Sequence, residues 1–128
     1  MIENRLVDQV LDVSFDVHRR LGPGLLETVY EVILHQKLSS IGLSVERQVS
    51  VPISFDDIRF DEGFRADLIV ENKLIIELKS VKALEPVHAK QVLTYLRLLD
   101  MRLGLLINFN EELLTNGIKR VANRMPSS

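Results

Sequence analysis

The stretch Asp67–Lys79, DLIVENKLIIELK, decides how this chain can fold. Two apolar runs flank ENK, a sequence typical of turns, so the stretch predicts a β-hairpin. Three charged residues lie inside these apolar runs: Asp67, Glu77 and Lys79. Burying a carboxylate is costly unless it is paired or binds a metal. Either these charges lie on a solvated face of the hairpin, or they are buried and have a functional role.

The length of the hairpin loop determines whether the two carboxylates meet. A three-residue loop, Glu71–Lys73, pairs Val70 with Leu74. Asp67 then lies opposite Glu77, with Cβ atoms about 4.5–5.5 Å apart. A two-residue loop instead points the two carboxylates toward opposite faces of the sheet. A functional role for the pair requires the three-residue loop.

Two interpretations of the charges remain open at this point. In one, Glu77 and Lys79 make ordinary ion pairs on a solvated face. In the other, a divalent cation lies between Asp67 and Glu77, which would otherwise repel each other until one takes up a proton. Strand alternation favours the metal, because apolar residues share the charged face and also fill the opposite face. The first group is Ile69, Ile75 and Val81, and the second is Ala66, Leu68, Val70, Leu74, Ile76 and Leu78.

The remaining sequence predicts one α/β domain over residues 1–128, a mixed β-sheet flanked by helices in the order α-α-β-β-β-β-α-β. Helices are expected over residues 3–21, 25–41 and 87–99, from their apolar periodicity. Pro52 indicates an edge or a bulge in the first strand. Strands are expected over residues 43–55, 58–60, 64–70, 74–81 and 103–109, with a turn at 61–63, a strand or helix at 117–124 and a frayed tail at 125–128.

Composition limits the classes of function. The chain has 128 residues, no cysteine and a formal net charge of -2, which disfavours a protein that simply coats nucleic acid but allows a nuclease. Without cysteines, any metal must be held by oxygen or imidazole ligands, and the three histidines lack zinc-like spacing. The first residues do not resemble a signal peptide, and no run is long enough to span a bilayer, so we expect a cytoplasmic protein without a membrane partner.

Asp67 followed by Glu77-Leu78-Lys79 resembles the D…(D/E)xK signature of the PD-(D/E)XK nuclease superfamily. More narrowly, GLLETVY at residues 24–30 resembles the motif that names the GxxExxY protein family. That family also has segments similar to RADLIV, IELK, HAKQVLTYL and GLLINFN. The resemblance extends from the first helix to Arg120. Ala66 stands where the superfamily signature has proline.

The resemblance implies a restriction-endonuclease-like core and a set of site residues. Asp67, Glu77 and Glu27 would bind Mg²⁺, with Mn²⁺ as a possible substitute. Lys79 would orient the attacking water or stabilise the transition state. Gln91 and Tyr95 match a Q-x-x-x-Y pattern on the third helix.

Other residues have weaker assignments from the pattern alone. Arg65 and His88 are predicted to contact phosphate or to support the site, and Tyr30 is predicted to pack in the core. Lys119, Arg120 and Arg124 either follow a nucleic-acid backbone or are solvated charges.

The resulting hypothesis is a divalent-metal-dependent phosphodiesterase that cuts nucleic acid, DNA by family analogy, and that forms a homodimer to grip a duplex. The alternative is a catalytically silent nuclease-fold domain that works as a nucleic-acid-binding or protein-assembly module. The acidic pI of about 5.9 favours this alternative, and the intact set of Glu27, Asp67, Glu77 and Lys79 favours the enzyme.

Overall fold

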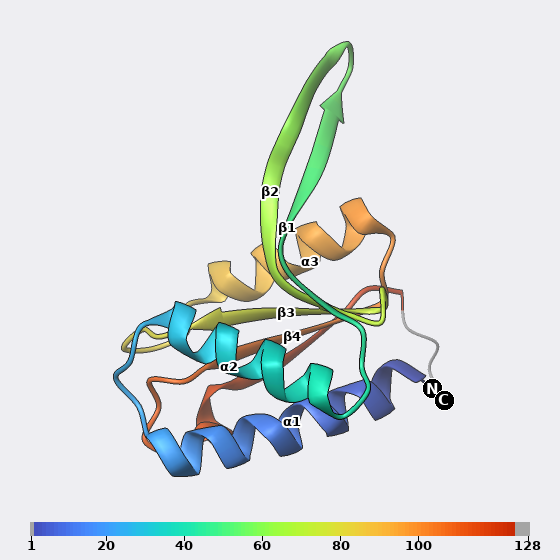
Figure 1. Ribbon diagram of the computed structural model, residues 1–128. Helices are drawn as coiled ribbons and strands as arrows, with labels where there is room; N and C mark the ends of the chain where they lie inside the picture. The colour runs from blue at the N-terminus through green and yellow to red at the C-terminus, as the bar shows by residue number, and fades with distance from the viewer. Residues whose placement is uncertain (1, 125–128) are drawn as a thin grey trace.

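A computed structural model describes residues 2–124, so the predicted frayed tail lies outside the described residues. The described part is an α/β fold with a mixed five-stranded sheet (Figure 1). In chain order the elements are α1 (Ile2–Leu21), α2 (Glu27–Ser40), β1 (Val45–Phe55), β2 (Ile58–Val70), β3 (Leu74–Lys79), α3 (Pro86–Leu99), β4 (Leu103–Asn108), a 3₁₀ turn (Leu114–Gly117) and β5 (Ile118–Ala122).

The strands lie in the order β1-β2-β3-β4-β5. β3 and β4 are parallel, because α3 connects them, and the other neighbours are antiparallel. Helices α1 and α2 cover one face of the sheet and α3 covers the other (Figure 1). The predicted fold class is therefore confirmed, and the segment that was ambiguous in sequence forms the edge strand β5.

Each face of the sheet has its own apolar cluster. Leu34 and Leu38 of α2 lie fully buried against the α1–α2 face of the sheet. Alternating residues of the central strands complete this cluster, among them Leu68, Val70, Leu74, Ile76, Leu78, Leu105 and Ile107. The cluster beneath α3 is smaller: Ala66, Ile69, Ile75, Val92, Leu96 and Val121. None of the helices within residues 2–124 combines the length and apolar character needed to cross a membrane.

The predicted turn at residues 61–63 is wrong. These residues continue β2, so only three strands precede α3, and the predicted order of four strands before it is corrected. Val51 pairs with Phe64 and Ile53 pairs with Phe60, which leaves residues 61–63 as a bulge opposite Pro52. Pro52 has no N–H to donate to the ladder, and the bulge absorbs the missing bond.

The predicted face of Ala66 is also wrong. Ala66 packs in the α3 cluster, whereas Leu68 packs on the α1–α2 face. The ladder between β1 and β2 is interrupted between the pairs Arg47–Leu68 and Val49–Ala66. Gln48, which lies in this gap, has a φ of 50°, a left-handed conformation that breaks strand alternation. The interruption falls directly opposite Asp67.

Candidate functional site

The two strand carboxylates meet on the α3 side of the sheet. Val70 pairs with Leu74, and the three-residue loop between them sets a register that carries Asp67 opposite Glu77. The ladder itself ends at the preceding pair, because the Asp67 side chain takes over its next bond. Asp67 Oδ2 accepts the Leu78 N–H at 2.9 Å, which fixes the carboxylate against β3.

Glu77 is the most unusual side chain of the site. It is only 6% exposed, and its Oε1 atom has no hydrogen-bond partner within residues 2–124. Burial, together with the neighbouring Asp67 carboxylate, raises the pKa of Glu77 to about 9. Near neutral pH Glu77 therefore keeps a proton unless a cation takes its place. A buried, unpartnered carboxyl oxygen beside a second carboxylate is an arrangement that fits a bound hard cation.

Lys79 lies two residues beyond Glu77 on the same side of β3. It is half-buried, and its positive charge opposes the rise in the pKa of Glu77. Its backbone is fixed by a hydrogen bond from the Phe109 N–H to the Lys79 carbonyl at 2.9 Å. The strand thus holds an ammonium group next to the carboxylate pair.

The GLLETVY segment is fastened to the end of β3. The Tyr30 hydroxyl donates to the Gly22 carbonyl at 2.7 Å and accepts the Leu25 N–H at 3.2 Å. The ring of Tyr30 is fully buried and stacks on Phe109, so its predicted packing role is confirmed. Ser80 Oγ donates to the Leu25 carbonyl at 2.7 Å, which ties this loop to the residue after Lys79.

Glu27 stands at the first position of α2, and its Oε1 accepts the Ser80 N–H at 3.2 Å. This bond brings Glu27 to the end of the strand that carries Glu77 and Lys79. Within residues 2–124, however, no three acidic or histidine side chains converge closely enough to form a metal-ligand group. In this arrangement Glu27 borders the Asp67–Glu77 pair and does not complete it.

Of the predicted residues on α3, Tyr95 is the one whose pKa responds to both carboxylates. Burial raises the pKa of Tyr95, and the charges of Glu77 and Asp67 raise it further, which places its hydroxyl in their field. Its ring stacks on Phe64 of β2, with centroids 3.9 Å apart. Gln91 is exposed one turn earlier on the same side of the helix. His88 is engaged differently: its Nδ1 accepts the Glu85 N–H at 2.9 Å at the start of α3.

Arg65 is not brought to the carboxylates. It alternates along β2 with Phe64 and Ala66, which contact the α3 layer, so its side chain points away from that layer. Its Nε donates to Glu62 Oε1 at 2.6 Å, in an exposed ion pair.

A cavity of about 400 Å³ is lined in part by Leu106, the β4 neighbour of Glu77. Leu106 of β4 pairs with Glu77 on one side and with Lys119 of β5 on the other, so all three lie in one row across the sheet. Leu106 and Lys119 line the cavity together with Lys90 and the start of α3. Arg120 and Arg124, the other basic residues near the end of the chain that were considered for nucleic-acid contact, have partners elsewhere. Arg120 donates to Asn4 and Arg124 pairs with Asp100.

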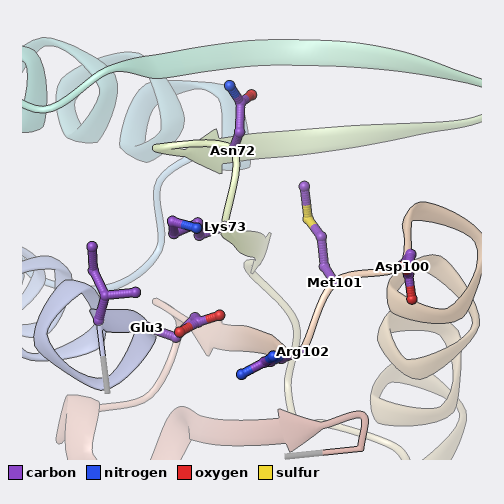
Figure 2. Close-up of a pocket in the computed structure, with 7 residues that line it drawn as sticks. Glu3, Asn72, Lys73, Asp100, Met101 and Arg102 are labelled. Atoms are coloured by element: carbon purple, nitrogen blue, oxygen red, sulfur yellow. The ribbon is translucent and has the colours of Figure 1, made fainter.

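A second cavity, of about 340 Å³, lies at the opposite end of β3 (Figure 2). Its lining comes from the β2–β3 turn, the first turn of α1 and the loop after α3, and includes Glu3, Lys73 and Arg102. It contains none of the predicted site residues. The carboxylate pair, Lys79 and Glu27 therefore lie toward the carboxyl end of β3, away from this second cavity.

Four residues that support the site are missing from the sequence-based set. Gln48 donates to Glu31 Oε1 at 2.6 Å, and Arg47 donates to Glu31 Oε2 at 2.8 Å, which anchors the break in β1 to α2. Asn108 is fully buried and bonds both the N–H and the carbonyl of Val81, which fixes the chain just after Lys79. The sequence could have pointed to Asn108, because it is a polar residue directly after the apolar run LGLLI. No sequence pattern pointed to Gln48.

Comparisons with known proteins agree with this geometry at the level of the family. A family model described as the PD-(D/E)XK nuclease superfamily matches residues 4–121. Neither curated proteins nor solved structures gave a match. The matched region contains the whole sheet core, the carboxylate pair and Lys79. On this match, the chain belongs to the PD-(D/E)XK nuclease superfamily.

Proposed function

We propose that the protein is a nuclease of the GxxExxY family, and that it hydrolyses phosphodiester bonds in DNA with a divalent metal, Mg²⁺ or Mn²⁺. The observation that carries this proposal is the buried Glu77 carboxyl, whose Oε1 lacks a partner among residues 2–124 and lies beside Asp67. A structural role would leave this arrangement unfavourable, because an unsatisfied buried carboxyl destabilises the fold.

Asp67 and Glu77 are the residues that would hold the cation, and Mg²⁺ suits a site with few protein ligands because it keeps several waters. When bound, the metal would supply an activated water and neutralise phosphate charge. Lys79 lies beside the carboxylates on β3, where its ammonium group can stabilise negative charge that develops on the phosphate.

Glu27 supports the site from the end of β3 through its bond to the Ser80 N–H. The GxxExxY motif then has a physical interpretation: Gly24 adopts a φ of 96°, Tyr30 fastens the loop, and Glu27 begins the helix at the site. Lys90 and Lys119, in the cavity next to Glu77, are suited to a phosphate of the bound strand.

Cleavage assays test the proposal. Purified protein with Mg²⁺ or Mn²⁺ is incubated with single-stranded, duplex and branched DNA, and Asp67→Asn, Glu77→Gln and Lys79→Ala are compared with the parent. Each variant should lose at least about 100-fold in rate. Lys73→Ala removes an exposed lysine at the other end of β3 and should cleave like the parent. A parent without activity on all three substrates, or a fully active Lys79→Ala, would refute the proposal.

One observation favours the second candidate, a silent nuclease-fold module. Within the described residues no group of three metal-ligating side chains has formed. Calorimetric titration with Mn²⁺ separates the candidates: the enzyme should bind Mn²⁺ and lose this binding in Asp67→Asn, whereas a silent module should show the same heats in both proteins.

A further inference from the structure

The β1–β2 hairpin extends far beyond the sheet as a two-stranded arm (Figure 1). Beyond the bulge at Pro52, Ile53 pairs with Phe60 and Phe55 pairs with Ile58. Paired residues, and residues two apart on a strand, share a face, so these four apolar side chains lie on one face of the arm. Arg59 and Asp61 pair at 3.6 Å and stand at alternate positions on the same strand.

This apolar face of the arm is unpartnered within residues 2–124. Phe55 is 69% exposed, and Ile58 and Phe60 are also more than half exposed. An isolated two-stranded ribbon is marginally stable in water, so an arm of this kind gains from being covered. Its turn, Asp56-Asp57, adds two exposed carboxylates at the tip. The arm is therefore an apolar ribbon with an acidic end, which disfavours nucleic acid as its partner.

A surface with the complementary character lies between α1 and α2. An apolar cavity of about 150 Å³, the α1–α2 groove, is lined by Val17, Leu21 and Ile33 and flanked by two basic residues, Arg20 and Lys37. Exposed apolar side chains continue the surface on α2 and on the two residues before it: Leu25, Leu26, Val29 and Val32. Leu26 is 76% exposed.

The charges of the two surfaces are matched. Asp57 of the arm and Lys37 of the groove have no ion-pair partner among residues 2–124, whereas Arg20 already contacts Asp16. Both surfaces occur on the same chain, but the arm projects away from α1 and α2, so it cannot fold back into its own groove (Figure 1). A second copy of the chain supplies a groove that the arm can reach.

We propose that two copies of this protein dimerise by reciprocal arm exchange, each placing the apolar face of its arm on the α1–α2 groove of the other. Asp57 of one copy then faces Lys37 of its partner. Reciprocity doubles the buried surface, which a single narrow arm needs in order to approach the roughly 1,200–2,000 Å² of a stable interface. A two-fold arrangement also closes the assembly and prevents growth into open chains.

Charge reversal tests the proposal by analytical ultracentrifugation at low salt. Asp57→Lys sets like charges against Lys37 at both contacts of the dimer, and Lys37→Asp does the same against Asp57. If each reversed contact weakens association about tenfold, the dimer dissociation constant rises about 100-fold in each variant. Asp57 is the better choice at the tip, because Asp56 has a φ of 53°, which Lys adopts less readily.

Mixing the Asp57→Lys and Lys37→Asp variants gives the decisive measurement. In the mixed dimer, the lysine introduced on the arm of one chain meets the aspartate introduced in the groove of the other. The second contact is the native one, so two chains that are each monomeric should associate together. Asp8→Lys and Lys73→Asp reverse exposed charges away from both surfaces and should dimerise like the parent. Circular dichroism melting verifies that all variants are folded.

Three results for the parent and the two charge variants would overturn the proposal. The first is a parent that stays monomeric at about 100 μM, a concentration at which specific dimers of this size associate. The second is a parent that grows into open chains. The third is a mixture of the two variants that remains monomeric. Phe55→Ser provides an independent arm variant, and a parent-like dimer in Phe55→Ser would also contradict arm exchange.

Discussion

The two faces of the sheet differ in what they contain. The face under α1 and α2 has the larger apolar cluster, built mainly from buried Leu, Ile and Val side chains. The face under α3 has a smaller apolar cluster, which stops at the carboxyl end of β3. There the places that apolar residues would occupy are taken by Asp67, Glu77 and Lys79.

Within one sheet, the α1–α2 face contributes most of the stability, and the α3 face carries the candidate site. A residue on β3 contributes to one face or the other according to its position: Ile76 and Leu78 pack under α2, whereas Glu77 between them enters the field of Tyr95. The large cluster supplies the free energy that allows the α3 face to keep a buried carboxyl whose Oε1 atom has no hydrogen-bond partner within residues 2–124. Substitutions on the two faces should therefore differ in kind as well as in size.

The largest expected effect comes from the α1–α2 face. Leu34→Ala removes a fully buried side chain of α2 and should lower the free energy of unfolding by about 3 kcal/mol. Urea denaturation at constant m-value measures the loss. Leu98→Ala, at an exposed position of α3, is the matched control and should change stability much less. Equal effects of the two substitutions would show that burial against the α1–α2 face does not determine what Leu34 contributes to stability.

The next effect has the opposite sign and belongs to the α3 face. The pKa of Glu77 is about 9 in the folded protein and near 4.5 when unfolded, so between these values the unfolded chain releases a proton that the folded protein keeps. Stability therefore falls as pH rises through this window. Glu77→Gln removes the titration and should stabilise the metal-free protein by about 2 kcal/mol at pH 8, less than the full linkage value because buried carboxyls relax.

Thermal denaturation in chelator at pH 8 and pH 4.5 measures this gain, which should be much smaller at the lower pH because the folded carboxyl is then protonated and the unfolded one is half protonated. Glu46→Gln, at an exposed position of β1, is the control and should be neutral at both pH values. Mn²⁺ should stabilise the parent and leave Glu77→Gln unchanged. A destabilised Glu77→Gln at pH 8 would mean that the carboxyl has a partner after all.

Local sequence was sufficient for the hairpin and insufficient for the strand beside it. ENK predicted a turn and left its length open between two and three residues; the three-residue loop that forms sets the register that brings Asp67 to Glu77. The face of Ala66 depends on Gln48, a non-glycine residue in a left-handed conformation on another strand, which no pattern within β2 reveals. The alternation of β2 side chains between the two faces is therefore broken by a residue of β1, the neighbouring strand.

The turn predicted at residues 61–63 failed for a similar reason. Asp-Glu-Gly is a favourable turn sequence, yet pairing with β1 on both sides keeps it in the strand as a bulge. Gly63 is required because a Cβ atom there would lie 2.1 Å from the Ile53 side chain. The glycine was visible in sequence, but its purpose depends on packing between strands.

A smaller effect is expected where α2 meets the site. Tyr30→Phe removes the hydroxyl that bonds Gly22 and Leu25, and should lower stability by about 1.5 kcal/mol while the ring stays on Phe109. Hydrogen exchange should then accelerate at the amides of residues 22–26 and not in β4. Unchanged exchange in that loop would show that Tyr30 does not hold the loop that leads to Glu27.

The smallest effect is expected at the edge of the sheet, where two adjacent basic residues of β5 point to opposite faces. Lys119 pairs with Leu106 and lines the cavity beside Glu77, whereas Arg120 pairs with Leu105 and donates to Asn4 of α1. In an Asp67→Asn background, which prevents cleavage, Lys119→Ala should weaken DNA binding by less than about 1 kcal/mol and reduce the salt slope of log K by about 0.9, the value of one phosphate contact. Arg120→Ala should leave the slope unchanged, because its side chain lies under the other layer. Fluorescence anisotropy at several salt concentrations measures both slopes, and equal slopes for the two variants would mean that the α3 face does not select the path of the nucleic acid.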